Sequence, residues 1–247
     1  MIKFFRIIRQ QLINQNKMGK YFKYAIGEII LVVIGILLAL QINNWNEESK
    51  NRVKEREALE GIKTALESDL RLYEKVYQPR FDRKKQGLEF LKNAAYHKLT
   101  PPEDSVRKYF GRMGTDIFFR NDIGPYDALK SAGFELIKNK ELRKQIINTY
   151  EVSLPAYTRF INDFTDHQLP LEQEFKKGLI QNYVAKKQDG TFDVWYRINV
   201  KSLLTNPSFL NLIAIEQNKY ENYTNRMRSV KRIMNELIKE IDKKLEP

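Results

Sequence analysis

The chain has 247 residues, of which 42% are hydrophobic and 12% aromatic, and this composition excludes a disordered chain. Cysteine is absent, which excludes a disulfide framework, a thiolate nucleophile and a cysteine-ligated metal. The net charge is +12, and half of it lies in residues 1–23, which hold six basic residues and no acid. Such a tail is attracted to anionic membrane lipids. A nucleic-acid partner is not expected, because the rest of the chain has no basic stripe with interleaved aromatic residues.

The first predicted element is a transmembrane helix over residues 24–42, with the sequence YAIGEIILVVIGILLALQI. A helix of this length rises about 28 Å, close to the thickness of the hydrocarbon core. A cleaved signal peptide is the alternative, but no small-x-small cleavage pattern follows the apolar run. Trp45 is well placed as an interfacial anchor.

The distribution of basic residues predicts the orientation of this helix. Six Lys and Arg residues lie in residues 1–23 and four lie in residues 50–56, so the basic tail is expected to stay cytoplasmic and the large domain to lie outside. In a two-membrane bacterium this means an inner-membrane protein with a periplasmic domain. Residues 2–13 place apolar side chains at helical spacing, and we expect this amphipathic tail to lie on the inner membrane surface.

Glu28 is an ionisable residue about one turn inside the predicted span. A carboxylate there is costly, so three interpretations are open: it reaches toward Lys20, Lys23 or lipid headgroups, it takes part in helix association, or it belongs to a proton or ion pathway. Small residues allow helices to approach closely, and a glutamine can hydrogen-bond across an interface. The residues expected at a membrane or oligomer contact are Gly27, Glu28, Gly35, Ala39, Gln41 and Trp45.

The span and its flanks, YAIGEIILVVIGILLALQINNWNEE, resemble the N-terminal signature of a family of uncharacterised single-pass membrane proteins from Bacteroidetes-type bacteria, classed as a domain of unknown function. A second, looser stretch is similar to the same family and comprises Tyr126, Leu129, Lys130, Ser131, Gly133, Leu136, Ile137, Asn139, Leu142 and Arg143. Ala132 departs from the pattern, which has a second serine there. The resemblance implies a bacterial inner-membrane setting and brings no activity, substrate or catalytic residue.

Beyond the span, the sequence predicts a mostly α fold: a stalk helix over residues 43–78 and a helical domain over 79–247 that packs back on the stalk. The stalk has apolar residues at steps of three and four, and Pro79 is expected to end or kink it. Further helices are expected up to Tyr96, from Thr100 as the cap to Met113, over 125–132, from Asn139 to Tyr150, over 156–180, and from Asn206 to Leu245. One small β-hairpin is expected over 182–198, with its turn at Asp189 and Gly190.

No catalytic, cofactor or metal site is predicted. The two histidines, His97 and His167, lie in separate segments, and neither an HExxH nor a G-x-S-x-G motif occurs. The expected loop over residues 114–124 offers a candidate partner surface at Phe118, Phe119, Arg120 and Asp122. The alternative is that the phenylalanines fill the core and Asp122 caps a turn.

These observations favour a non-enzymatic, membrane-anchored structural or interaction protein of the cell envelope. It is expected to self-associate through span and stalk and to bind another envelope protein. The alternative is a periplasmic sensory or ligand-binding helical domain that works through a partner subunit. A polar pocket in the helical bundle would favour this alternative.

Overall fold

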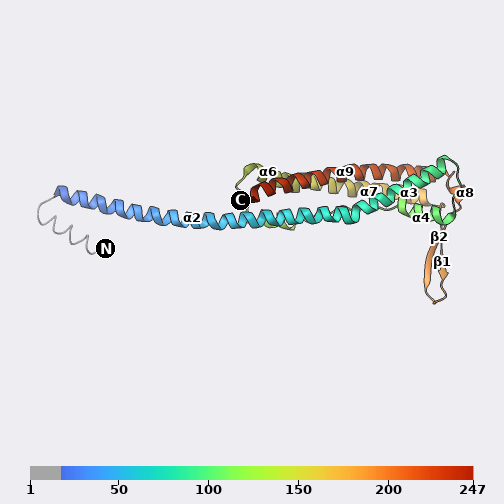
Figure 1. Ribbon diagram of the computed structural model, residues 1–247, viewed down its shortest axis with the longest axis horizontal. Helices are drawn as coiled ribbons and strands as arrows, with labels where there is room; N and C mark the ends of the chain where they lie inside the picture. Colours follow the sequence, from blue (N-terminus) through green and yellow to red (C-terminus); the bar gives the residue numbers. More distant parts are fainter. Residues whose placement is uncertain (1–17, 247) are drawn as a thin grey trace. The chain divides into compact units, whose positions relative to one another are not determined.

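The computed structural model describes residues 18–246 of the chain, so the predicted amphipathic tail at residues 2–13 lies outside the described residues. The described part is mostly helical and contains one antiparallel β-hairpin, which confirms the predicted fold class (Figure 1). The chain divides into two compact units, Met1–Arg56 and Glu57–Pro247.

The first unit consists, in its described part, of the beginning of helix α2 (Met18–Leu72). This helix is long and apolar enough to cross a membrane, and among the described residues its most apolar 18-residue window is fully unburied. Its exposed side chains include Ile29, Leu31, Val33, Leu37 and Leu40. An apolar surface of this extent is unfavourable in water and favourable in lipid.

Pro79 does not end the helix that begins in α2. A π-helical turn, η1 (Tyr73–Tyr77), connects α2 to helix α3 (Gln78–Tyr96), and Pro79 lies in the first turn of α3. A proline lacks an N–H and its ring clashes with the carbonyl group four residues earlier. The wider π-helical turn changes the hydrogen bonding at that point, so the helical path continues.

The same arrangement recurs at Pro155. Helix α6 (Lys140–Ile147) leads into a second π-helical turn, η3 (Asn148–Ser153), and then into helix α7 (Leu154–Lys176), with Pro155 in its first turn. The sequence predicts an end or a kink at Pro79 and a break between the helix that ends at Tyr150 and the helix that begins at residue 156. In the structure, a π-helical turn precedes each of the two prolines, and the helical path continues through it.

Helix α4 (Glu103–Met113) begins later than the predicted cap at Thr100. Its N-cap is Pro102. Pro101 precedes another proline and is therefore driven away from the helical region of backbone space, so the helix begins only after Pro102. The cap predicted at Asn139 is present, because its side chain accepts hydrogen bonds from the backbone N–H groups of Glu141 and Leu142 at 3.0 and 3.1 Å.

Helices α3 and α4 pack very closely at Gly87. A Cβ atom added there would lie 2.5 Å from the backbone nitrogen of Met113 and 2.6 Å from the backbone oxygen of Tyr109. Residues 114–123 then form an irregular strap that leads to helix α5 (Gly124–Ala132). Gly133, with a φ of +96°, ends α5, and a short 3₁₀ turn, η2 (Phe134–Leu136), follows.

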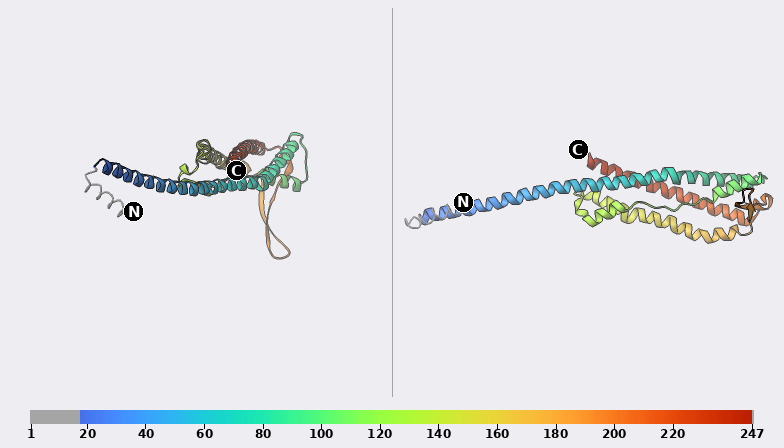
Figure 2. Two further views of the ribbon diagram at one scale, coloured as in Figure 1. Left: turned by 60° about the vertical axis from the view of Figure 1, so that its left-hand side comes forward. Right: turned by 90° about the horizontal axis from the view of Figure 1, so that it is seen from below.

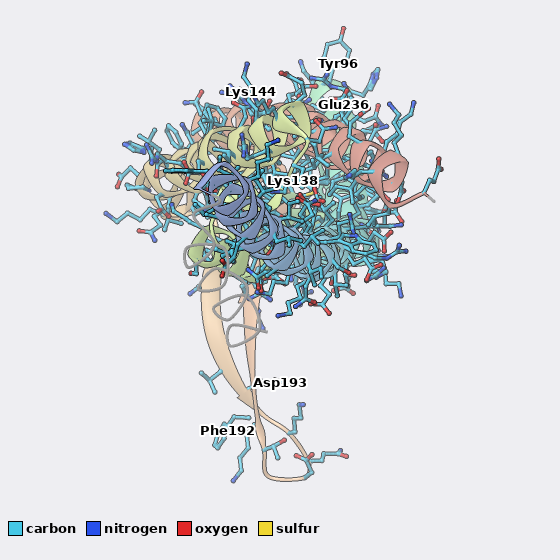
Figure 3. All side chains as sticks on the ribbon, turned by 90° about the vertical axis from the view of Figure 1, so that its left-hand side faces the viewer. Tyr96, Lys138, Lys144, Phe192, Asp193 and Glu236 are labelled. Atoms are coloured by element: carbon cyan, nitrogen blue, oxygen red, sulfur yellow. The ribbon has the colours of Figure 1, made fainter. Side chains whose placement is uncertain are left out.

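The hairpin consists of β1 (Gln181–Lys186) and β2 (Phe192–Arg197), paired in register from Gln181 with Arg197 to Lys186 with Phe192. Gly190 has a φ of +85°, as the predicted turn requires, and the Asp189 carboxylate accepts a hydrogen bond from the Thr191 N–H at 2.9 Å. The hairpin projects from the helices of the second unit (Figure 3). At its base, the Tyr196 hydroxyl donates to the backbone oxygen of Arg107 at 3.0 Å.

Helix α8 (Val200–Leu203) leads to the long helix α9 (Pro207–Leu245), whose N-cap is Asn206 as predicted. Within the second unit, α9 is antiparallel to the last turns of α2 (Figure 2). Ion pairs connect Lys63 with Asp242 at 2.5 Å and Glu74 with Lys231 at 2.8 Å.

The second unit has two hydrophobic cores. The first is built from the end of α2, η1, the start of α3, the strap, α5, α6, η3, α7 and the C-terminal part of α9, and includes Leu66, Tyr150, Ile161, Tyr223 and Leu237. The second is built from α3, α4, α8 and the N-terminal part of α9, and includes Leu91, Val106, Met113, Leu203 and Phe209. Tyr220 packs against both cores.

Candidate functional site

Five charged side chains from three helices and the strap meet inside the second unit. We call this group the charge layer, and it comprises Lys84 of α3, Asp116 of the strap, Glu172 of α7, and Glu216 and Lys219 of α9. Four of them have side chains that are at most 2% exposed, and Asp116 is 23% exposed. Charged residues are almost never buried to this degree unless they are paired.

The contacts in the charge layer connect every element that contributes to it. Lys84 forms an ion pair with Glu216 and donates a hydrogen bond to the backbone oxygen of Met113 at 2.7 Å. Lys219 forms an ion pair with Glu172 and a second one with Asp116, whose Oδ1 lies 2.7 Å from the Lys219 Nζ. The layer therefore ties the strap and three helices together.

The charge layer lies between the two cores. On each helix its residues are flanked by members of the first core on one side and of the second core on the other, as Lys84 is flanked by Phe81 and Leu88. On α9, Ile213 precedes the pair of charges and Tyr223 follows it. The layer thus divides the apolar interior into two parts.

The pKa values of two members of the charge layer, Glu216 and Lys219, are shifted from their usual values. Burial raises the pKa of Glu216, and the nearby Lys84 and Lys219 only partly oppose this effect. Burial alone would lower the pKa of Lys219, but Glu216 and Asp116 raise it well above its usual range. Glu216 Oε1 is buried without a hydrogen-bond partner among the described residues. Lys219 therefore holds its charge, and Glu216 takes up a proton more readily than an exposed glutamate does.

The next question is whether the charge layer could bind a metal ion or supply a free amine. Within residues 18–246, no group of three or more His, Asp or Glu side chains is arranged to hold a metal ion. The Nζ atoms of both lysines are already engaged by carboxylates and backbone oxygens. A well-paired buried group of charges fixes the register of packed helices, and this is the role that the geometry supports.

A separate cavity of about 400 Å³ lies at the base of the hairpin. Five segments line it: the start of α4, residues 178–181, residues 197–199, α8 and the N-cap of α9. Its polar lining residues include Glu103, Arg197, Asn199, Ser202 and Asn206. The volume is within the range of pockets for small molecules.

The predicted span residues lie on α2 and are divided between two faces. At about 100° per residue, Glu28, Gly35 and Ala39 lie within about 40° of one another, and Gly27, Gln41 and Trp45 form a second group roughly 100° away. Gly35, Ala39, Gln41 and Trp45 are exposed, and Gly27 and Glu28 are half-buried. The helix brings Glu28 and two small residues together but separates Gln41 from them.

Only part of the predicted partner surface is exposed to solvent. Phe118 is 61% exposed, and Arg120 and Asp122 are also exposed. The prediction that Phe119 belongs to this surface is wrong, because its side chain is only 4% exposed. Side chains along the strap point alternately outward and inward, as in a β-strand, so that Phe119 lies in the core against Tyr77. The Asp122 carboxylate accepts a hydrogen bond from the Gly124 N–H at 2.9 Å, so it also stabilises the turn before α5.

Neither the charge layer nor the cavity is predicted from the sequence. Glu216 and Lys219 carry a signal, because they occupy inward positions in the apolar stripe of α9 between Ile213 and Tyr223. No such signal marks the cavity, whose walls come from segments far apart in the sequence.

Comparison with known proteins identifies a family for the chain. No curated protein and no solved structure matches the chain significantly. The model of a family of unknown function, DUF6090, matches residues 28–222, which include most of the apolar segment, the strap, the hairpin and the charge layer. The chain therefore belongs to DUF6090, a family of unknown function.

Proposed function

We propose that this chain is a non-enzymatic, membrane-anchored interaction protein of the cell envelope. The observation that carries the proposal is the apolar segment of α2, which is long enough to span a membrane and whose most apolar 18 residues are unburied in the part of the chain that the structure describes. Helix α2 continues from this segment into the first core of the second unit, where Leu59, Ile62 and Leu66 are buried. An anchor that is continuous with a packed helix is suited to hold a domain at a membrane.

The proposal includes an orientation. The basic residues before the apolar segment outnumber those directly after it, which supports a cytoplasmic N-terminus and a second unit on the other side of an inner membrane. The basic tail would then contact anionic lipids of the cytoplasmic leaflet.

The proposal also includes self-association through α2. Glu28, Gly35 and Ala39 share one face of the helix, and small residues at such a face allow two helices to approach closely. A carboxyl group beside them would be shielded from lipid in an assembly of two or more copies. Another envelope protein would bind at the exposed part of the strap, formed by Phe118, Arg120 and Asp122.

The absence of cysteine allows a direct test of anchoring and orientation. Single-cysteine variants Asn16→Cys and Asn93→Cys would be expressed in bacteria and treated with a membrane-impermeant maleimide. We expect the protein to remain in membranes after alkaline carbonate extraction, Asn93→Cys to react in intact spheroplasts, and Asn16→Cys to react only after permeabilisation. Release by carbonate would contradict the anchor, and the reverse labelling pattern would contradict the orientation.

A second candidate function is a sensory or ligand-binding domain. The cavity at the base of the hairpin favours it, because a polar concavity is a feature that ligand binding requires and a purely structural bundle does not. In this function the anchor would hold a receptor, and a partner subunit would supply the output.

A further inference from the structure

The strap over residues 114–123 is held to the second unit by side chains. Among the described residues, the backbone of residues 116–122 forms no hydrogen bond with another backbone group. A segment without backbone pairing is held less firmly than the helices beside it. Three side chains bond to this backbone at 3.0 to 3.5 Å: Arg80 donates to the Asp116 carbonyl, Tyr77 donates to the Phe118 carbonyl, and Asp69 accepts from the Asp122 N–H.

The closed strap buries backbone groups as well as apolar side chains. Ile117 and Phe119 are 1% and 4% exposed and belong to the first core. The backbone of neither residue forms a hydrogen bond with any group in residues 18–246. These N–H and carbonyl groups would be hydrated if the strap moved away from the core, and hydration favours the released state. Burial of two apolar side chains therefore favours closure, and the buried backbone opposes it.

The two ends of the strap are held differently. Near its beginning, Asp116 belongs to the charge layer and forms an ion pair with Lys219 at 2.7 Å. Near its end, the Asp122 N–H donates to Asp69, and the two carboxylates of this pair repel each other when both are ionised. Opposite charges thus fix the first end, whereas like charges meet at the second. Release is therefore expected to begin at Asp122.

The charge on Asp69 depends on pH while the strap is closed. Burial raises its pKa to about 6, the hydrogen bond from the Asp122 N–H opposes this effect, and the Asp122 carboxylate adds to the rise. The titratable groups that face Asp69 are Asp122 of the strap, Tyr77 of η1 and Tyr150 of η3. Burial raises the pKa of both tyrosines, so they stay neutral wherever Asp69 titrates. No cation in the described part of the chain forms an ion pair with Asp69.

We propose that the strap is a latch: residues 117–123 stay on the first core while Asp69 is protonated and are released more often when Asp69 is ionised. The inference rests on the proposed function, because the strap carries the surface assigned to an envelope partner, and it names the regulation of that surface. Phe118, Arg120 and Asp122 hold fixed positions only in the closed strap. A rising pH therefore weakens the partner surface, and a bound partner holds the latch closed.

Linkage gives the direction and size of the effect. The closed strap holds the proton of Asp69 with a pKa of about 6, whereas a hydrated aspartate has a pKa of about 3.9. The released fraction is therefore constant below about pH 4, rises between about pH 4 and 6, and is constant again above this range. The full rise is roughly a hundredfold, and solvent screening of a half-buried group reduces it to roughly ten-fold.

Hydrogen exchange measured by mass spectrometry tests the latch in the full-length protein in mild detergent. The parent protein is compared with Asp69→Asn, which retains an acceptor for the Asp122 N–H and does not ionise. Comparison at equal pH cancels the intrinsic pH dependence of amide exchange. In peptides from residues 115–123, we expect the ratio of the parent rate to the variant rate to rise roughly ten-fold between about pH 4 and pH 7.

Two controls isolate the latch. Asp127→Asn removes one exposed negative charge of α5, and its exchange ratio to the parent in the strap peptides should not change with pH. Addition of about 1 M urea separates release of the strap from unfolding of the whole unit. Release exposes little surface, so strap exchange should be unchanged in urea, whereas exchange by unfolding accelerates.

Two results would overturn the latch. One is a ratio of parent to Asp69→Asn that does not change with pH in the strap peptides. The other is strap exchange that accelerates in urea and is as slow as exchange in the buried part of α9, because the strap would then open only when the unit unfolds. Neither result depends on the membrane anchor, which carbonate extraction and maleimide labelling test separately, so the two proposals fail independently.

Discussion

Lys84 of α3 and Glu216 of α9 form an ion pair although they are 132 positions apart and their side chains are 1% and 0% exposed. Each is the main counter-charge of the other inside a protein interior, where an unpaired charge is strongly unfavourable. The pair therefore makes the packing of α3 against α9 depend on both residues at once.

The variant Lys84→Met should destabilise the protein by about 3–5 kcal/mol, because Glu216 would remain buried with only Lys219, 3.9 Å away, as a partner. The double variant Lys84→Met with Glu216→Leu should recover much of this loss, since no unpaired charge remains. Chemical denaturation measures both. Lys85→Met, at the exposed pair with Glu89, is the control and should cost less than about 1 kcal/mol. A similar small cost for Lys84→Met would show that the ion pair is not a determinant of the packing.

The variant Gly87→Ala should destabilise the contact between α3 and α4, because its Cβ would lie 2.5 Å from the Met113 backbone nitrogen and helix backbone cannot move without disturbing the second core. We expect a loss of about 1–3 kcal/mol in thermal unfolding, as for other overpacked sites. Gly61→Ala provides the contrast: its Cβ would lie 3.6 Å from Pro125 Cβ, so the higher helix propensity of alanine should leave stability equal or raise it by up to about 1 kcal/mol. Equal effects at the two glycines would contradict the close approach.

Asp69 should make stability depend on pH. Burial raises its pKa to about 6, although its carboxylate accepts a hydrogen bond from the Asp122 N–H at 3.0 Å, and the neighbouring Asp122 carboxylate adds to the rise. The folded protein then holds the proton more tightly than the unfolded chain, where an aspartate has a pKa of about 3.9, so this group lowers stability as the pH rises from roughly 4 to 6.

The variant Asp69→Asn retains an acceptor for the Asp122 N–H and removes the titration. The stability of this variant relative to the original protein should increase by about 1 kcal/mol between pH 4 and pH 6, after allowance for solvent screening of a half-buried group. Denaturation series at several pH values measure the difference. Asp127→Asn, exposed on α5, controls for the loss of one negative charge. A difference that does not change with pH would show that Asp69 titrates normally.

Gly35→Leu should weaken self-association through α2, because a large side chain separates two helices that meet at the face of Glu28, Gly35 and Ala39. Light scattering of the full-length protein in mild detergent should then report a lower mass. Val33→Leu, on roughly the opposite face, should leave the mass unchanged. A monomeric parent protein would refute the proposed self-association, and equal loss in both variants would refute the assignment of the face.

The sequence predicts those elements whose cause is local. Asn139 and Asn206 cap helices with their own side chains, and Asp189 with Gly190 makes a turn that only such residues form readily. The apolar segment of α2 is likewise evident from composition alone. In each case the residues that determine the structure are neighbours in the chain.

The remaining features depend on residues that are distant in the chain. Charged side chains are exposed in most proteins, so nothing near Lys84 indicates that Glu216 will neutralise it. Thr100 has the chemistry of a cap, but the two prolines after it delay the helix. Phe119 differs from Phe118 only in the direction imposed by the strap, which the sequence of a loop does not specify.

The charge layer also affects how the second unit comes apart. A domain unfolds cooperatively when its apolar contacts form one continuous core. In the second unit the charge layer separates the two cores, and Tyr220 packs against both of them. Amide hydrogen exchange should therefore resolve two cooperative blocks with different opening free energies: the slower containing the junction of α2, α7 and α9, the faster containing α3, α4 and the hairpin base. Because burial raises the pKa of Glu216, the packed state takes up this proton more readily than an opened state does, so this carboxyl weakens the attachment between the blocks as the pH rises.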